Sequence, residues 1–131
     1  MQRNMSSKLL NTPDKLRAKD RDFINRLVTA TVAQMGKGRI SLHDIASEMC
    51  ITRGQLNRRV KSLTGMTAQQ YTLSVRMRQA RILLQEQPLM PINEIAYHCG
   101  FDDATSFSRA FRRSFSTTPS SYREQEGLQT H

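Results

Sequence analysis

The sequence predicts an all-α fold in which two helix-turn-helix units, each of the three-helix homeodomain-like kind, are joined by one long helix. Apolar residues recur at helical spacing along most of the chain. Capping residues, glycines and prolines divide this pattern into segments. One pattern also occurs twice: it opens as Leu42-His43-Asp44-Ile45-Ala46 and again as Ile92-Asn93-Glu94-Ile95-Ala96.

The two copies also match after the turn of each unit, with a change of one residue in their offset. Their offset is 50 residues through the first helix and 51 after the turn, so one residue is inserted at the second turn. The matching positions are Ile51 with Phe101, Leu56 with Phe107, Val60 with Phe111, Gly65 with Ser116, Thr67 with Thr118, and Tyr71 with Tyr122. Two copies are too few for a solenoid, and the long helix between them would interrupt its stacking.

A polar, basic stretch and one helix precede the first unit. Residues 1–19 are typical of a flexible tail or a linker remnant, and the domain itself is predicted over residues 20–125. Helical spacing over residues 20–35 predicts a helix that ends at Gly36-Lys37-Gly38. Its expected buried residues are Ile24, Leu27, Val28, Thr31 and Met35.

The first helix-turn-helix unit is predicted over about residues 40–66. Ser41 is the expected N-cap of a helix over 42–49. Thr52 is the expected cap of the next helix, over about 53–63. Gly65 then ends that helix in a left-handed conformation.

The second half of the chain repeats this organisation. Pro88 and Pro91 end the linker helix that follows the first unit, and Pro119 suits the first position of a closing helix. The expected elements are a linker helix over about 68–86, a second unit over about 91–115 with helices over 92–98 and about 104–114, a closing helix over about 119–125, and a disordered tail over 126–131.

Charge favours a polyanionic partner. The chain of 131 residues has a formal net charge of +9 and a pI near 10.4. A basic solubility surface would give the same total, but here the basic residues gather in stretches and the acids lie mainly elsewhere. The stretches are Arg53, Arg58, Arg59 and Lys61; Arg76, Arg78 and Arg81; and Arg109, Arg112 and Arg113.

Size and cysteine content set two further expectations. Each unit of about 45 residues is too small to be comfortably stable alone, so the two units are expected to share the linker helix as a common wall. Cys50 and Cys99 each stand at the end of an apolar helix stripe. Both are expected to be buried free thiols.

The start of the second helix in each unit carries the candidates for reading base edges, because a helix-turn-helix places that part in the major groove. Asparagine can pair with adenine through two hydrogen bonds, and arginine with guanine, whereas alanine and threonine methyl groups can touch thymine. The first unit is therefore expected to supply more hydrogen-bonded readout, and the second more shape and phosphate contact. The candidates are Arg53, Gly54, Asn57 and Arg58, and then Ala104, Thr105, Ser108 and Arg109.

Other polar residues of the same helices are expected to contact DNA phosphates. These are Thr52, Lys61, Arg112 and Arg113. For each candidate taken singly, the alternative is an ordinary solvated helix face. Arg76 is expected to have a structural role instead, pairing with an acid in the fold, since it lies where the linker helix faces the units it joins.

No motif indicates an enzyme, a metal site or a cofactor site. HExxH, glycine-rich phosphate loops, CxxC and nucleophile elbows are absent, and the histidines lie on an exposed face, near a helix end and at the terminus. No stretch approaches the ~18–20 apolar residues of a membrane span. A secretory signal is not visible either, so we expect a cytoplasmic location and no membrane contact by this segment.

Over about residues 38–123 the chain resembles the AraC/XylS family of bacterial transcription regulators. The most specific part is Ile92-x-x-Ile95-Ala96-x-x-x-Gly100-Phe101-x-Asp103-x-Thr105-x-Phe107-Ser108-Arg109-x-Phe111-Arg112-Arg113, closing with Pro119-x-x-Tyr122-Arg123. Arg76-Met77-x-x-Ala80-x-x-Leu83-Leu84 is similar to the family's linker helix. The chain departs from the pattern at Val60, Ser106 and Ser116, where the family usually has phenylalanine, an aromatic residue and glycine.

The resemblance implies seven helices, with both recognition helices in successive major-groove segments of one double-stranded DNA operator. Such grooves lie about 34 Å apart, and DNA bending, costing of order 1–6 kcal/mol, makes up any shorter spacing. It also implies transcription regulation, most often activation with RNA polymerase as partner, and dimerisation through a domain missing here. The opening helix resembles the segment before this domain in hybrid two-component regulators, which indicates an output domain; a stand-alone short regulator is the alternative.

Two other functional classes stay open at this point. One is a nonspecific basic nucleic-acid binder, which would show a steep salt dependence and no sequence preference. The other is a protein-interaction module whose basic faces serve an acidic partner.

Overall fold

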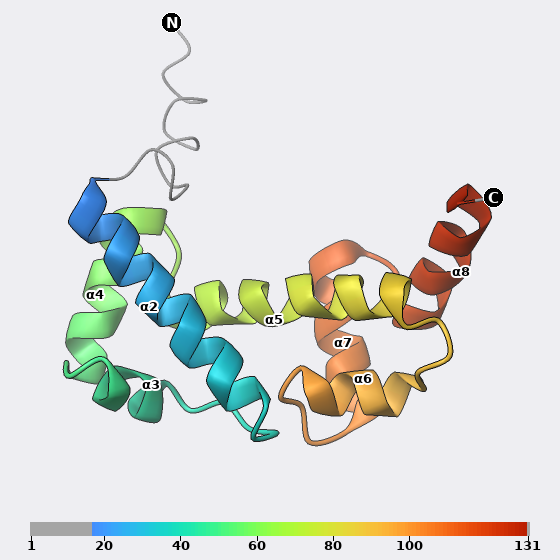
Figure 1. The fold of residues 1–131 in the computed structure, drawn as a ribbon, viewed down its shortest axis with the longest axis horizontal. Coiled ribbons are helices and arrows are strands. Elements are labelled where there is room, and N and C mark those ends of the chain that lie inside the picture. The colour runs from blue at the N-terminus through green and yellow to red at the C-terminus, as the bar shows by residue number, and fades with distance from the viewer. Residues whose placement is uncertain (1–16, 131) are drawn as a thin grey trace, which may run out of the picture. The chain divides into compact units, whose positions relative to one another are not determined.

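The computed structural model describes residues 17–130, with side chains described for residues 17–126. This part of the chain is helical and contains no strand. Its helices are α2 (Ala18–Met35), α3 (Leu42–Glu48), α4 (Arg53–Thr64), α5 (Ala68–Glu86), α6 (Ile92–His98), α7 (Ala104–Phe115) and α8 (Pro119–Thr130) (Figure 1).

The chain divides into two compact units. Unit 1 contains the described residues up to Thr31 together with Ser41–Leu73, and unit 2 contains Val32–Ile40 and the chain from Ser74 onward. The linker helix α5 contributes its beginning to unit 1 and its remainder to unit 2. Within unit 1, α3 and α4 form the helix-turn-helix; within unit 2, α6 and α7 form the other (Figure 1).

Aliphatic residues form most of the core of unit 1, beside the buried ring of Phe23. Ile24 and Leu27 of α2, Ile45 of α3, and Leu56 and Val60 of α4 are all fully buried. These are positions at helical spacing, so each helix buries one stripe and leaves its other face to solvent. Val28 and Leu63, which the same spacing also places inside, are only half-buried.

Aromatic rings cluster in the core of unit 2, beside buried aliphatic residues such as Leu84 and Ile95. Phe107 and Phe111 of α7 are completely buried, with their ring centroids 5.9 Å apart. Phe111 lies 4.7 Å from Phe115 and 5.6 Å from Tyr122, and Phe107 lies 5.5 Å from Phe101. Such tilted and edge-to-face pairs stabilise beyond their buried area. The two units thus fill equivalent positions with different chemistry.

The repeat begins earlier than the sequence pattern indicates. α2 starts at Ala18 and α5 at Ala68, which are 50 residues apart. An arginine on each helix then donates to the carbonyl at the end of the next helix: Arg26 to Met49 at 3.4 Å, and Arg76 to Cys99 at 2.9 Å. The weak side-chain similarity between α2 and α5 conceals this equivalence in the sequence.

Residues with a left-handed backbone conformation occupy equivalent positions in the two units. Cys50 (φ 61°) corresponds to Gly100 (φ 85°), and Gly65 (φ 79°) to Ser116 (φ 62°). The expectation that Cys50 is buried is wrong, because the thiol is exposed. The apolar stripe of α3 ends one residue earlier, at the buried Met49, which corresponds to the buried Cys99.

Helix ends agree with the sequence-based boundaries, except at the start of α2 and the end of α8. α2 begins at Ala18, inside the expected tail 1–19, and residues 1–16 of that tail lie outside the described residues. α8 continues to Thr130 instead of ending near 125, so helix replaces most of the expected tail 126–131. Gln85 on α5 explains part of this extension, because it donates to the Tyr122 hydroxyl at 2.8 Å and to Glu126 at 3.0 Å.

We expect Ser116→Gly to raise the free energy of unfolding by about 0.5–1 kcal/mol, because glycine adopts the left-handed conformation without the Cβ penalty. Ser116 has φ 62° and ends α7. Denaturant unfolding of the variant and the wild type would measure the difference. Ser114→Gly, at an exposed position inside α7, is the matched control and should instead destabilise by about 0.5 kcal/mol. A loss of stability in Ser116→Gly would contradict the argument.

Candidate nucleic-acid interface

Local capping positions the start of both recognition helices. Thr52 accepts a hydrogen bond from the Gln55 backbone at 3.1 Å, and Gln55 accepts one from the Thr52 backbone at 2.9 Å, which forms a capping box for α4. In unit 2, Asp103 accepts from the Ser106 backbone at 2.7 Å and from its hydroxyl at 3.3 Å. These bonds to Ser106 lower the pKa of Asp103, because they stabilise its ionised form.

The expected base-reading residues of unit 1 share one exposed side of α4. Arg53, Gly54, Asn57 and Arg58 are all exposed. A Cβ built on Gly54 would lie 3.5 Å from the Arg58 guanidinium, so the Arg58 side chain reaches back toward the start of the helix. That start is the part of a recognition helix that approaches base edges.

In unit 2 the corresponding residues lie on the outer side of α7. Thr105 and Arg109 are exposed, whereas Ala104 and Ser108 are half-buried. Arg109 occupies the position equivalent to Arg58, 51 residues later. Each unit therefore presents one long, planar guanidinium at the same place on its recognition helix.

Asn57 has a partner that the sequence does not reveal. Its side-chain Oδ1 accepts a hydrogen bond from the backbone N–H of Ala68 at 2.8 Å. Paired recognition of adenine requires the asparagine oxygen as an acceptor and its nitrogen as a donor. That oxygen is directed toward the start of α5 in this structure, whereas two-bond pairing with adenine would need it at the base edge.

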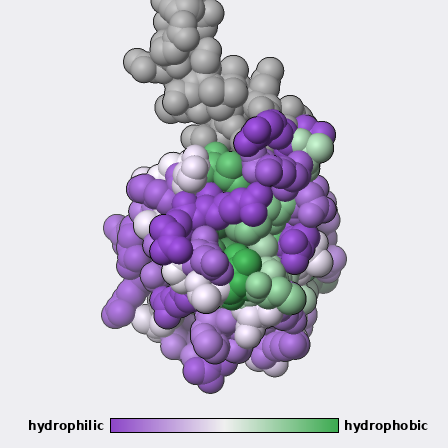
Figure 2. All heavy atoms as spheres, turned by 90° about the vertical axis from the view of Figure 1, so that its left-hand side faces the viewer, coloured by the Kyte–Doolittle hydropathy of each residue, from purple (hydrophilic) through white to green (hydrophobic). Residues whose placement is uncertain are grey.

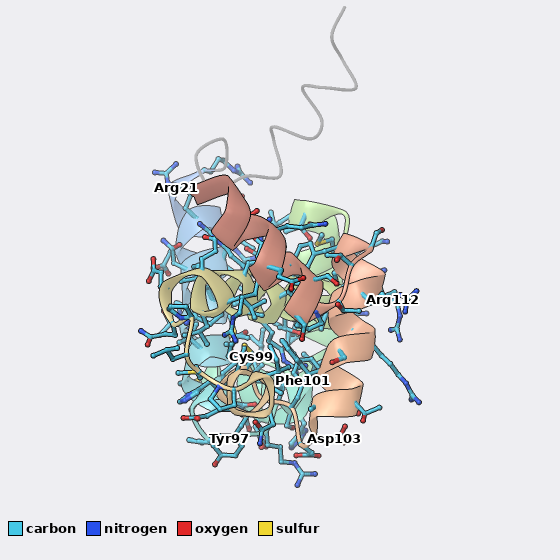
Figure 3. The ribbon with its side chains drawn as sticks, turned by 90° about the vertical axis from the view of Figure 1, so that its right-hand side faces the viewer. Arg21, Tyr97, Cys99, Phe101, Asp103 and Arg112 are labelled. Atoms are coloured by element: carbon cyan, nitrogen blue, oxygen red, sulfur yellow. The ribbon has the colours of Figure 1, made fainter. Side chains whose placement is uncertain are left out.

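The expected phosphate contacts lie further along the same helices. Lys61, Arg112 and Arg113 are exposed and belong to the last turns of α4 and α7, where their charges also suit the helix dipole. Figure 3 shows Arg112 projecting outward from α7, while Asp103 lies at the beginning of that helix. Thr52 is exposed, and its oxygen takes part in the capping box.

Hydrophilic residues cover most of the side of unit 1 seen in Figure 2, and hydrophobic residues form a narrow strip between them. A groove of about 500 Å³ on unit 1 is lined by basic and polar residues from α4 and from the start of α2, including Lys19, Arg58 and Ser62. Arg17, Lys19 and Arg58 make the lining of this groove mainly basic, with Asp20 as an acidic member beside Arg59.

Arg59 belongs to the fold despite lying in the basic stretch of α4. Its Nη2 is 3.2 Å from the Asp20 carboxylate, and its guanidinium lies 4.4 Å from the centre of the Phe23 ring. Both partners come from α2. Arg59 therefore joins α4 to α2.

Arg76 has the expected structural role, but its hydrogen-bond partners are carbonyl groups and not an acid. Its Nε donates to the Cys99 carbonyl and its Nη2 to the Gly100 carbonyl, both at 2.9 Å. The guanidinium also lies 3.9 Å from the centre of the Phe101 ring. Desolvation lowers the pKa of Arg76, and nearby Cys99 and Asp102 partly oppose that shift. The arginine thereby holds the turn between α6 and α7.

Cys99 is a buried free thiol, as expected. Burial raises its pKa to about 12, so it stays protonated and unreactive at neutral pH. Within the part of the chain that the structure describes, no three His, Cys, Asp or Glu residues are placed to hold a metal ion. None of the described helices is both long enough and apolar enough to cross a membrane.

Comparison with known proteins agrees with this geometry. A family described as a helix-turn-helix domain matches residues 45–125. The HTH-type transcriptional activator RhaS of Escherichia coli O157:H7 is 38% identical over 80 residues, which are 61% of this chain and 28% of the activator. The chain spans about a third of the length of the curated relatives it matches.

Two solved structures also share the fold. The DNA-binding domain of AdpA, described as a global transcriptional factor in complex with a target DNA, is 26% identical with a TM-score of 0.67, covering 78% of this chain and 94% of that one. The C-terminal domain of AraT, a response regulator from Geobacillus stearothermophilus, is 26% identical with a TM-score of 0.64, covering 76% and 84%. The chain accordingly belongs to the AraC family of transcriptional regulators, as a DNA-binding domain of the AraC helix-turn-helix type.

Proposed function

We propose that this chain binds double-stranded DNA at specific sequences and regulates transcription, with α4 and α7 in successive major-groove segments of one operator. The observation that carries the proposal is the equivalent placement of two capped helix starts, each with an exposed polar side and a basic last turn. A nonspecific binder requires basic charge but no such repetition of recognition faces.

Arg58 and Arg109 are the central base-reading residues of this proposal. Each is exposed, and an arginine can donate two hydrogen bonds to the O6 and N7 atoms of guanine. Arg53 adds a further donor at the start of α4. At the start of α7, Ala104 and Thr105 offer methyl groups to thymine, so the second half-site is read more through shape.

Phosphate contacts then hold each helix in its groove. Lys61, Arg112 and Arg113 provide the positive charge, and the Thr52 hydroxyl lies beside the start of α4. These contacts carry no sequence information themselves, but they determine the orientation of the helix relative to the bases.

The regulatory role is proposed as activation with RNA polymerase as partner. RhaS, a relative, is named an activator. The C-terminal domain of AraT belongs to a response regulator, which supports a role as the output domain of a two-component sensor-regulator. Dimerisation would then use a domain outside this chain, and the place of action is the cytoplasm, where the DNA lies.

We expect Arg58→Ala and Arg109→Ala each to lose the base preference of one half-site and to weaken binding by about tenfold or more, because a two-bond arginine–guanine pair provides about 1–3 kcal/mol of discrimination. Selection of bound sequences from a random double-stranded DNA pool at near-physiological salt would reveal the motif. Fluorescence anisotropy on the selected site would then give the affinities.

Arg78→Ala is the matched control, because Arg78 is an exposed arginine of α5 outside both recognition faces. It removes the same charge and should leave the selected motif unchanged. Equal binding by all variants with no enriched motif would support phosphate attraction or a protein partner and would refute specific reading.

A further inference from the structure

We infer that Asn57 is a positioning and specificity-determining residue whose carbonyl oxygen is held by the start of α5, so that only its amide N–H groups face the DNA. This inference rests on the proposed function, because it assigns a particular chemistry to one residue of the recognition helix. It proposes contact through N–H donors in place of adenine selection through two hydrogen bonds.

The start of α5 supplies the reason for this contact. The first backbone N–H groups of a helix have no acceptor within the helix. Thr67 accepts from the Gln70 backbone at 3.1 Å, which leaves the Ala68 N–H to be satisfied elsewhere. Ala68 is only 1% exposed, and its N–H donates to Asn57 Oδ1 at 2.8 Å. Without Asn57 this N–H would lose its acceptor.

The repeat provides an independent argument for the pairing. Position 57 corresponds to Ser108, and position 68 corresponds to Pro119. Proline has no backbone N–H, so the second unit needs no acceptor at the equivalent place. Asparagine, whose side chain is long enough to act as the acceptor, thus occurs in the unit that has a backbone N–H at position 68. The shorter serine occurs in the unit without one.

The held oxygen determines what Asn57 can recognise. Adenine pairing uses the asparagine oxygen to accept from N6 and the asparagine nitrogen to donate to N7. With the oxygen directed toward the Ala68 N–H and away from the base edge, Asn57 presents only its N–H donors to the DNA. It therefore suits any base edge that offers an acceptor, such as N7 and O6 of guanine or O4 of thymine. Adenine gains no advantage from a second bond.

The surroundings leave the amide accessible to a base edge. Asn57 lines a hollow of about 470 Å³ in unit 1, bounded by the starts of α3, α4 and α5. Arg53 and Gly54 line the same hollow. The absence of a side chain at Gly54 widens the approach, while the bond to Ala68 orients the amide within it.

Thermal melting of the 131-residue chain tests the held oxygen without DNA. We expect Asn57→Ala to lower Tm by about 4 °C or more, because the buried Ala68 N–H loses its acceptor. Asn57→Asp keeps an acceptor beside the positive end of α5, so its Tm should equal or exceed that of the wild type. A wild-type Tm in Asn57→Ala would overturn the inference, whether or not any other variant folds.

Ala68→Pro provides the matched second variant, because it reproduces the proline of unit 2 and removes the donor. In this background Asn57→Ala should change Tm by less than about 1 °C. Sequence selection should then show no adenine preference in the wild type at the base that depends on Asn57, and about a tenfold gain for adenine in Ala68→Pro.

A tenfold preference of the wild type for adenine over guanine at that base would overturn the inference, since it requires the oxygen to face the DNA. Failure of the proposed function looks different. In that case no protein in the series enriches any motif, while the melting temperatures still report whether Ala68 holds Asn57.

Discussion

We expect Phe111→Ala to lower the free energy of unfolding by about 3–5 kcal/mol, because it removes a fully buried ring. Phe111 is fully buried, and its ring lies within 6 Å of the rings of Phe107, Phe115 and Tyr122. Removing it leaves a cavity that three other rings line. A small domain has only about 5–15 kcal/mol of stability in total, so unit 2 would be close to unfolding.

Denaturant unfolding monitored by circular dichroism would measure this loss. Val60→Ala is the matched control, because Val60 is the equivalent, fully buried position of unit 1. It removes fewer atoms from a core of aliphatic side chains and should cost roughly half as much. Equal losses of stability in the two variants would mean that the aromatic cluster of unit 2 stabilises no more than the aliphatic packing around Val60.

Arg76→Met should cost about 3 kcal/mol, although methionine keeps much of the side-chain length. The substitution removes two hydrogen bonds from a charged group to the Cys99 and Gly100 carbonyls, as well as the contact with the Phe101 ring. The carbonyls would lose their donor in a part-buried turn. Because that turn precedes α7, base discrimination in the second half-site should weaken along with the stability.

Two control substitutions distinguish the hydrogen bonding of Arg76 from the effect of its positive charge alone. Arg78→Met removes an exposed arginine from the same helix and should change stability by less than about 0.5 kcal/mol. Arg76→Lys should rescue only part of the loss, because an ammonium group cannot make the same two bonds and lie flat on the ring. Full rescue by lysine would mean that position 76 requires only a positive charge.

Most helix boundaries could be predicted because the signals that set them are local. Ser41, Thr52 and Thr118 accept hydrogen bonds from backbone N–H groups three residues later, as capping residues do. Gly65 ends α4 in the left-handed conformation that its sequence position predicts. The extension of α8 beyond residue 125 was not predicted. The contact that reaches it, from Gln85 to Glu126, spans 41 residues.

The candidate site was likewise only partly predictable from the sequence. Repetition and helical spacing predict which residues lie on the outer side of each recognition helix. Arg58 and Arg109 are exposed as expected, whereas Ala104 and Ser108 are half-buried. Whether those residues contact bases stays a prediction. The spacing could not show that Arg59 is engaged by Asp20, because that contact joins residues 39 positions apart.

By itself the sequence determined the helical periodicity, the caps and the doubled pattern, since these depend on residues within one or two helical turns of each other. Only the tertiary structure decided what individual polar side chains do. Asn57 meets the Ala68 N–H 11 residues away, and Arg76 meets the Cys99 carbonyl 23 residues away. The physical reason is that a backbone group without a partner in its own helix must be satisfied by whichever side chain the packing brings near.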